Sequence, residues 1–265
     1  MKENKYNTIE LNIEEKVGTI TLARPEIRNA FNDQMIEELL EAIDILSGKE
    51  QLRALVITGK GKAFCAGADL SYMSQMKDNT YDQNLEGALK MAEVMHKLYR
   101  FKHPTVAKVN GATIGGGVGL VAACDIVISA HLSEFSFSEV KIGLVPAVIS
   151  PFVMKKVGEA NSTYLFLSGE RISADRAREY GLVTEVVTRE LLNSRVEQVL
   201  RMLMSSGPQA LSAVKELIRR VADVPLSDST SFTAELIAKL RVSDEGQEGM
   251  NAFFEKRRPN WVKWH

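Results

Sequence analysis

Residues 55–70 read LVITGKGKAFCAGADL, and residues 110–129 read NGATIGGGVGLVAACDIVIS. In each stretch, a glycine-bearing turn separates a segment that favours a strand from one that favours a helix. Because the order of strand, glycine turn and helix occurs at least twice, the sequence predicts an α/β architecture.

The flanking residues extend this pattern along the chain. Residues 17–22 (VGTITL) alternate apolar and polar side chains, as a half-buried strand does. In the last quarter of the chain the pattern is helical, and Pro208 can open a helix at a position where its missing N–H does no harm. We therefore expect an α/β core over residues 1–195 and a helical region over residues 196–265.

The composition excludes several classes of partner. The chain has 265 residues, 25% of them charged, and a formal net charge of -1, which gives no bulk attraction for nucleic acid or membrane. The N-terminal residues are polar and lack the apolar run of a secretory signal. The most apolar stretch, residues 112–130, contains Asp125 and four glycines, so we expect a core segment there. A cytoplasmic protein is the expectation.

Metal and nucleotide motifs are missing from the sequence. Cys65 and Cys124 stand outside any CxxC or Cys/His cluster, which argues against zinc. No GxxxxGK[ST] run is present, and the pair Gly115 and Gly117 is not followed by a glycine at position 120, so the dinucleotide fingerprint fails. We expect no metal and no nucleic-acid partner.

The two glycine turns, residues 65–69 (CAGAD) and 115–117 (GGG), suggest a specific chemistry. Backbone N–H groups at the start of a helix are unsatisfied and lie at the positive end of its dipole. Two such groups that converge on one point form an oxyanion hole. Taken alone, either turn is more commonly just a tight connection between a strand and a helix.

Glu139 is the third candidate element. It lies in FSFSEVKIGLVP, residues 135–146, among apolar side chains. A carboxyl group in such surroundings has a raised pKa and can exchange protons near neutral pH. The alternative is a surface glutamate at the end of a strand, which is the commoner fate of a single Glu.

Six blocks of sequence, in order, resemble the crotonase family of enoyl-CoA hydratases and isomerases. They are TLARPEIRNAFN (21–32), LVITGKGKAFCAGADL (55–70), NGATIGGGVGLVAACDIVIS (110–129), FSFSEVKIGLVPAVISP (135–151), LSGERISADRAREYGLV (167–183) and AFFEKRRPNW (252–261). The resemblance spans nearly the whole chain. Its FSFSEVKIGLVPAVISP block is similar to segments of methylglutaconyl-CoA-type hydratase-like members.

The resemblance implies a fold, a substrate and an assembly. The fold is a spiral of repeated β-β-α units followed by a C-terminal helical trimerisation region. The substrate is an acyl-CoA thioester, so that coenzyme A is part of the substrate and no separate cofactor is needed. The assembly is a homotrimer or a dimer of trimers.

The same resemblance assigns catalytic roles. The backbone N–H groups of Ala68 and Gly116 form the oxyanion hole, and Glu139 transfers protons. Typical hydratases of the family carry a second glutamate where this chain has Gly119. We interpret this glycine as leaving vacant space and removing a negative charge. The expected activity is hydration of a short or branched 2-enoyl-CoA. The alternatives are a Δ3-Δ2 enoyl-CoA isomerase and a non-catalytic CoA- or RNA-binding member of the fold.

The coenzyme A site is also implied by resemblance. It runs along two segments and reaches C-terminal residues, often of a neighbouring subunit: Arg28, Ala30, Lys62, Ala63, Phe64, Ala66, Phe253 and Lys256. For Phe253 and Lys256 the alternative is an amphipathic helix with a solvated basic end. Four side chains after the first turn either line an acyl pocket or belong to a mobile loop, the loop being the plainer interpretation: Tyr72, Met73, Met76 and Tyr81. Residues 85–99 favour a helix.

Overall fold

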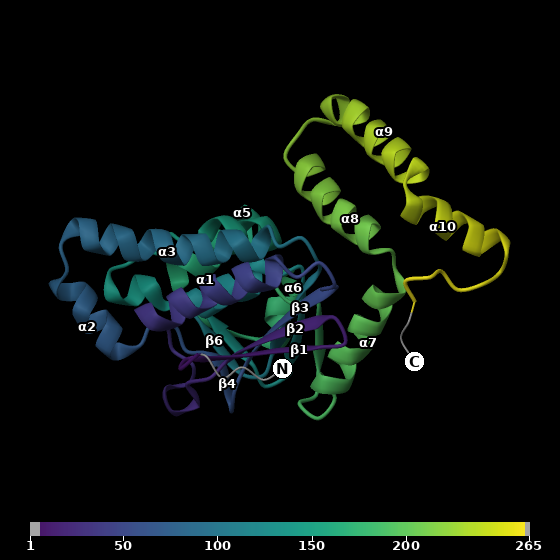
Figure 1. The fold of residues 1–265 in the computed structure, drawn as a ribbon. Coiled ribbons are helices and arrows are strands. Elements are labelled where there is room, and N and C mark those ends of the chain that lie inside the picture. The colour runs from purple at the N-terminus through teal and green to yellow at the C-terminus, as the bar shows by residue number, and fades with distance from the viewer. Residues whose placement is uncertain (1–5, 263–265) are drawn as a thin grey trace. The chain divides into compact units, whose positions relative to one another are not determined.

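A computed structural model describes residues 6–262, whose strands form two sheets (Figure 1). The larger sheet has the strand order β1-β2-β3-β5-β7-β10 and the smaller one the order β4-β6-β8-β9. The larger sheet contains β1 (Ile9–Glu14), β2 (Val17–Leu22), β3 (Ala54–Gly59), β5 (Thr105–Val109), β7 (Ile126–Ala130) and β10 (Glu185–Val187). The smaller sheet contains β4 (Ala63–Cys65), β6 (Ala112–Ile114), β8 (Glu134–Ser136) and β9 (Arg171–Ser173).

From β3 to β8, consecutive strands alternate between the two sheets, and this alternation confirms the predicted spiral of β-β-α units. Strands β3, β5 and β7 are parallel neighbours in the larger sheet. The strand after each of them, β4, β6 or β8, joins the smaller sheet, where these three are again parallel neighbours. Because β4 and β6 run in the same direction, the chain leaves both at the same edge. The two glycine turns that follow them are therefore placed side by side.

Helices cover the sheets and carry the next part of each repeat. In residues 6–196 they are α1 (Asp33–Ser47), α2 (Leu70–Asp78), α3 (Tyr81–Tyr99), α4 (Gly116–Ala123), α5 (Ser150–Ser168), α6 (Ala174–Glu179) and the start of α7 (Leu192–Ser205). Helices α1 and α3 lie side by side (Figure 1), joined by the Lys97–Asp44 ion pair at 2.6 Å. Within α4, residues 117–123 are all buried, as expected of a helix that is apolar on every face.

The segment after the first glycine turn is helical, whereas we interpreted it as a mobile loop. The Asp69 carboxylate accepts hydrogen bonds from the N–H groups of Ser71 and Tyr72 and so caps α2. Thr80 and Gln83 form a capping box that starts α3 at Tyr81, earlier than residue 85. The loop interpretation is therefore wrong, since the four side chains from Tyr72 to Tyr81 lie on these helices, and Tyr72 is buried.

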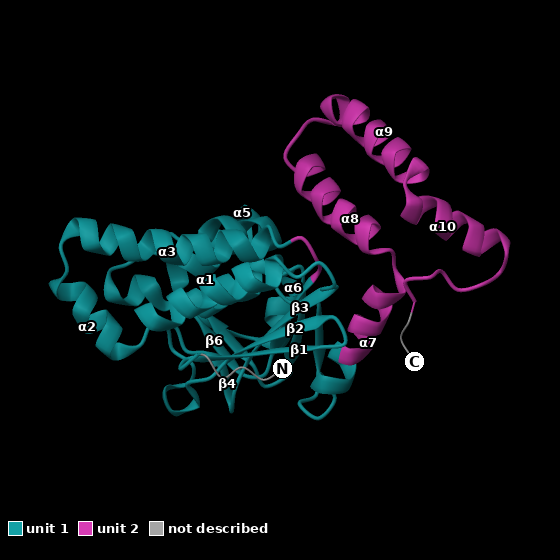
Figure 2. Ribbon diagram, viewed as in Figure 1, with its two compact units in different colours: residues 1–101, 105–196 teal, residues 102–104, 197–265 magenta. Residues whose placement is uncertain are grey.

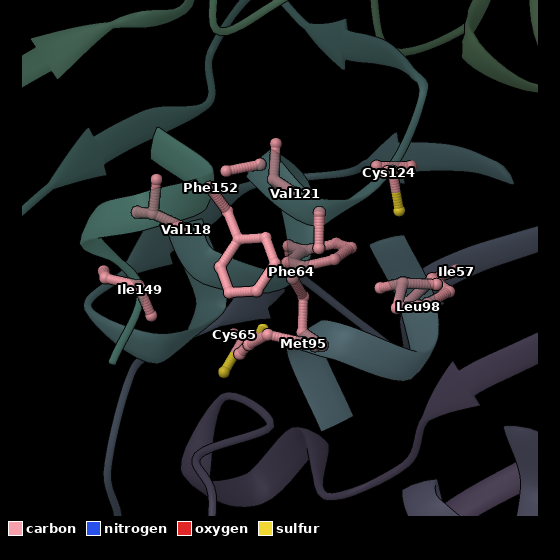
Figure 3. Packing of buried hydrophobic residues seen from close by; sticks show 14 of the residues in the cluster. Ile57, Phe64, Cys65, Met95, Leu98, Val118, Val121, Cys124, Ile149 and Phe152 are labelled. Carbon is pink, nitrogen blue, oxygen red and sulfur yellow. The ribbon is translucent and has the colours of Figure 1, made fainter. Parts of the chain in front are cut away.

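The buried core around α4 joins three helices and the smaller sheet (Figure 3). Its side chains include Phe64 of β4, Met95 of α3 and Val118 of α4, all fully buried. Ile149, just before α5, and Phe152, within it, complete this part of the cluster and are 3% and 7% exposed. The helix that begins at the second glycine turn is therefore enclosed by apolar side chains.

The chain divides into two compact units (Figure 2). Residues 1–101 and 105–196 form the first unit, and residues 102–104 and 197–265 form the second. The second contains α8 (Pro208–Val221), α9 (Leu226–Val242) and α10 (Asp244–Phe254). Its own contacts include the Glu245 carboxylate, which accepts hydrogen bonds from Gln209 and Ala210 at the start of α8. A role for these helices in assembly stays a prediction. Among residues 6–262, no helix has the length and apolar character needed to cross a membrane.

Candidate active site

The first glycine turn is held by a bridge to Phe31. The N–H of Phe31 donates to the carbonyl of Gly67 at 2.7 Å, and the N–H of Asp69 donates to the carbonyl of Phe31 at 2.9 Å. In a trans peptide the C=O and the N–H point in opposite directions. The bond to the Gly67 carbonyl therefore turns the N–H of Ala68 away from Phe31. Ala68 is exposed, and no described backbone carbonyl accepts a hydrogen bond from its N–H.

The second glycine turn is held by its own helix and by a hydrogen bond to β8. Gly115 has φ +52° and ψ −121°, a conformation that side-chain-bearing residues rarely adopt. Its N–H donates to the carbonyl of Ser136 at 2.9 Å, and its carbonyl accepts from the N–H of Val118 at 2.8 Å. Because that carbonyl points along α4, the N–H of Gly116 points out of the helix start, at the positive end of its dipole.

The two turns and Glu139 meet at one place. A Cβ atom added to Gly115 would lie 3.1 Å from Oε1 of Glu139 and 4.0 Å from the Cα of Gly67. The structure thus brings together the turns of Ala68 and Gly116 and the carboxyl group of Glu139. It also explains the glycine at position 115, where any larger residue would press on the carboxyl group.

The carboxyl group of Glu139 is partly buried. Glu139 lies in a short 3-10 helix, η2 (Ser138–Ile142). Its Oε2 atom is buried and has no hydrogen-bond partner within the described residues. Burial raises the pKa of Glu139, so the predicted direction of the shift is confirmed. A carboxyl group with a raised pKa and an unpartnered oxygen is suited to proton transfer. Its catalytic role stays a prediction.

The structure corrects our interpretation of Gly119. A Cβ atom at this position would lie 2.3 Å from Cγ2 of Ile149 and 3.0 Å from Cε of Met95. Both side chains belong to the core around α4 (Figure 3). The expected vacant space is therefore wrong, because α4 packs too closely against its neighbours. The negative charge is absent, but apolar atoms occupy the place of a side chain.

The two segments expected to hold coenzyme A lie against each other. Arg28 and Asn29 are in left-handed conformations, with φ of 56° and 58°. The Asn29 side chain is buried and donates to the carbonyls of Lys60, at 3.0 Å, and Ala63, at 2.9 Å. The N–H of Ala66 donates to the carbonyl of Arg28 at 3.0 Å. These bonds join residues 28–30 to residues 60–66.

The residues of these segments offer different groups to a ligand. Arg28 and Lys62 are exposed, and neither takes part in an ion pair described for residues 6–262. Ala30 and Ala63 are buried, and Phe64 is fully buried in the core, so Phe64 could offer only backbone groups. Phe253 and Lys256 belong to the second unit, where Phe253 is exposed and stacks edge-on with Phe254 at 5.9 Å between ring centroids.

Sequence reasoning missed one ion pair next to the first turn. Nη2 of Arg24 lies 2.7 Å from Oδ2 of Asp69, and the two side chains are 17% and 8% exposed. The only signal was their position in two of the matching sequence blocks, which does not show that they touch. Among the described residues, no three His, Cys, Asp or Glu side chains gather in a group that could hold a metal ion.

Comparisons with known proteins relate the chain to one family and to solved structures of the same fold. Residues 12–263 match the family model described as enoyl-CoA hydratase/isomerase. A crystal structure of an enoyl-CoA hydratase from Shewanella pealeana is 36% identical, covers 97% of each chain and superposes with a TM-score of 0.94. A trans-2-decenoyl-[acyl-carrier-protein] isomerase of Streptococcus mutans is 31% identical over 97% of this chain and 98% of its own.

A third relative has a hydratase name with a specified acyl group. The 2,3-dehydroadipyl-CoA hydratase of Escherichia coli is 29% identical, with 93% of this chain and 96% of its own covered. The family match spans both glycine turns and Glu139. The chain belongs to the enoyl-CoA hydratase/isomerase family.

Proposed function

We propose that this protein hydrates a 2-enoyl-CoA thioester and that Glu139 is its acid/base. The observation that carries the proposal is the buried, unpartnered oxygen of Glu139 beside the turns of Ala68 and Gly116. A carboxyl group that can gain or lose a proton thus faces two backbone donors, which is what enolate chemistry requires.

The steps follow from this geometry. The thioester carbonyl oxygen accepts hydrogen bonds from the N–H groups of Ala68 and Gly116. Glu139 takes a proton from water while the water oxygen bonds to the β carbon, and negative charge moves onto the thioester oxygen. The α carbon then takes a proton from Glu139, so that the elements of water have been added across the double bond. Each backbone donor is expected to lower the barrier by about 3–4 kcal/mol.

The second candidate function is a Δ3-Δ2 isomerase, and the packing at Gly119 favours it. Ile149 and Met95 fill the place of a side chain at position 119, so this position gives Glu139 no second glutamate as a partner. Moving a double bond needs a single group to carry a proton between two carbons, whereas hydration also requires a held water. The isomerase name of the Streptococcus mutans relative points the same way.

Within hydration, we favour a short or branched acyl group that can carry its own carboxylate. The absence of a second glutamate removes a negative charge that would repel such a group. The dehydroadipyl group in the name of the Escherichia coli relative carries a carboxylate. The methylglutaconyl type of substrate, expected from the sequence, has the same property.

The test is turnover of the purified protein with crotonyl-CoA, a branched carboxylated 2-enoyl-CoA and a 3-enoyl-CoA. Absorbance of the conjugated thioester should fall with the first two, faster with the carboxylated one. A rise with the 3-enoyl-CoA and no fall with the others would make the protein an isomerase. No change with any of them would favour a non-catalytic member of the fold.

The assembly proposed with this function is a homotrimer or a dimer of trimers. The helices of residues 197–265 are the elements expected to pack subunits, and α10 and the residues just after it carry Phe253 and Lys256. Light scattering at micromolar concentration should report three or six chains. A monomer would contradict the proposal.

A further inference from the structure

We propose that Arg24 and Asp69 are positioning residues that aim the Ala68 N–H at the substrate carbonyl. This inference rests on the proposed function. Neither side chain is assigned a role by the family resemblance, and both lie within the first unit, beside the first glycine turn.

Arg24 makes contacts to both sides of the Phe31 bridge. Its Nη1 donates to the carbonyl of Ala30 at 2.7 Å, and its Nη2 donates to Oδ2 of Asp69 at 2.7 Å. Ala30 precedes Phe31, and Asp69 follows Ala68. One guanidinium group therefore clamps the two strands of backbone whose pairing sets the direction of the Ala68 N–H.

Asp69 is fixed on its other side as well. Its Oδ1 accepts hydrogen bonds from the N–H of Ser71, at 2.7 Å, and the N–H of Tyr72, at 3.2 Å. Hydrogen bonds from Ser71 and Arg24 lower the pKa of Asp69 to about 2, so the carboxylate is ionised at any pH at which the enzyme would work. The ion pair is largely buried, where solvent screens it little.

The arrangement needs an arginine. A guanidinium group has two Nη atoms in a fixed plane, so it can contact the Ala30 carbonyl and the Asp69 carboxylate at once. A lysine at position 24 has one nitrogen at its end and would hold one of these partners well. The clamp thus predicts a graded response to substitution, which a simple charge requirement would not give.

The expected effect is on turnover more than on substrate binding. Full removal of one oxyanion donor costs about a hundredfold to a thousandfold in kcat, and a donor that is misaimed should cost about tenfold. Arg24→Gln and Asp69→Asn should each lower kcat by about tenfold and change KM by less than about threefold. The contacts to coenzyme A, which stabilise bound substrate and transition state equally, are kept in both variants. Arg24→Lys should recover part of the loss.

The two substitutions should not add. Both break the same link, so the double variant should be no slower than the slower single variant. Arg195→Gln is the matched control. Arg195 forms a partly exposed ion pair at 2.8 Å with Glu185, the first residue of β10, in the same unit. Its kcat should equal that of wild type, and melting temperatures of all variants identify any that fold poorly.

A spectroscopic readout separates positioning from general loss of structure. Butyryl-CoA has no double bond to hydrate, and its thioester carbonyl stretch should move to lower frequency on binding wild type. The movement should be smaller in Arg24→Gln and Asp69→Asn and unchanged in Arg195→Gln. The inference would be overturned if the wild type hydrates substrate and shifts the carbonyl stretch, and the Arg24→Gln and Asp69→Asn variants do both to the same extent. Wild type that does neither would overturn the proposed function instead.

Discussion

The two glycine turns present the same kind of backbone donor, but they are built in different ways. Residues 66–69 are held by partners that are distant in sequence, through the Phe31 bridge and the Arg24–Asp69 ion pair. Residues 115–117 are held mainly by the local geometry of Gly115 and by the start of α4. One donor therefore depends on side chains elsewhere, whereas the other depends on the absence of a side chain.

The largest effect should come from removing the ionisable carboxyl group of Glu139, which lies beside both turns. Glu139→Gln keeps the size of the side chain and removes its ionisable group, so kcat should fall by at least about a hundredfold. Binding of coenzyme A, measured by calorimetry, should be retained. Turnover close to that of wild type would contradict the assignment of Glu139, whichever turn matters more.

A side chain at Gly115 should distort the second glycine turn. Gly115→Ala places a methyl group 3.1 Å from Oε1 of Glu139 on a backbone with φ +52°. We expect kcat to fall by about a hundredfold, as when an oxyanion donor is lost. Gly158→Ala is the control, since Gly158 has φ +76° and no atom within 4 Å of the added carbon. Equal losses in both variants would mean that backbone strain, and not the contact with Glu139, is responsible.

A side chain at Gly119 tests whether α4 can accommodate a larger residue just after the second glycine turn. Gly119→Ala should lower the free energy of unfolding by about 1–3 kcal/mol, because the added carbon meets Ile149 and Met95. Gly119→Glu should lower it further and should not speed hydration of crotonyl-CoA. Chemical denaturation measures both, with Gly48→Ala as control, because the nearest atom there is 3.7 Å away. Faster hydration by Gly119→Glu would show that Ile149 and Met95 can move to make room for the larger side chain.

The smallest expected effect is on how the melting temperature depends on pH. Burial raises the folded-state pKa of Glu139, so its contribution favours folding at low pH and is lost as pH rises through that pKa. At neutral pH the wild type bears the cost of a buried charge that Glu139→Gln does not. The variant should therefore melt slightly higher than wild type at pH 7, and the difference should shrink as pH falls toward 4. A difference that grows on acidification would contradict the raised pKa.

The contrast between the turns also marks what the sequence could predict. Gly115 acts within a few residues of its own position, and the local glycine pattern placed the turn that it makes. The predicted α/β architecture is confirmed for the same reason, since it follows from repeated local units, whereas the spiral of β-β-α units was implied by the family resemblance. The start of α3 was missed, because the apolar pattern begins near residue 85 whereas the Thr80 capping box starts the helix at Tyr81.

Contacts between distant segments could not be predicted in this way. Arg24 and Asp69 lie 45 residues apart, and no local pattern reports that they meet. The interpretation of Gly119 failed for a related reason, because Ile149 comes from the next repeat of the spiral and fills the place from outside α4. A missing side chain in a sequence says nothing about which neighbour occupies its volume.

The parallel pairing of β4 with β6 has a further consequence for distance. Paired strands lie about 4.8 Å apart, whatever side chains they carry. Two N–H groups that each reach one oxygen at about 2.9 Å, from directions near the tetrahedral angle, stand about 4.7 Å from each other. The turns of Ala68 and Gly116 follow these two strands. The width of the proposed oxyanion hole would thus be inherited from the repeat distance of a sheet, which no point mutation in the turns can rescale.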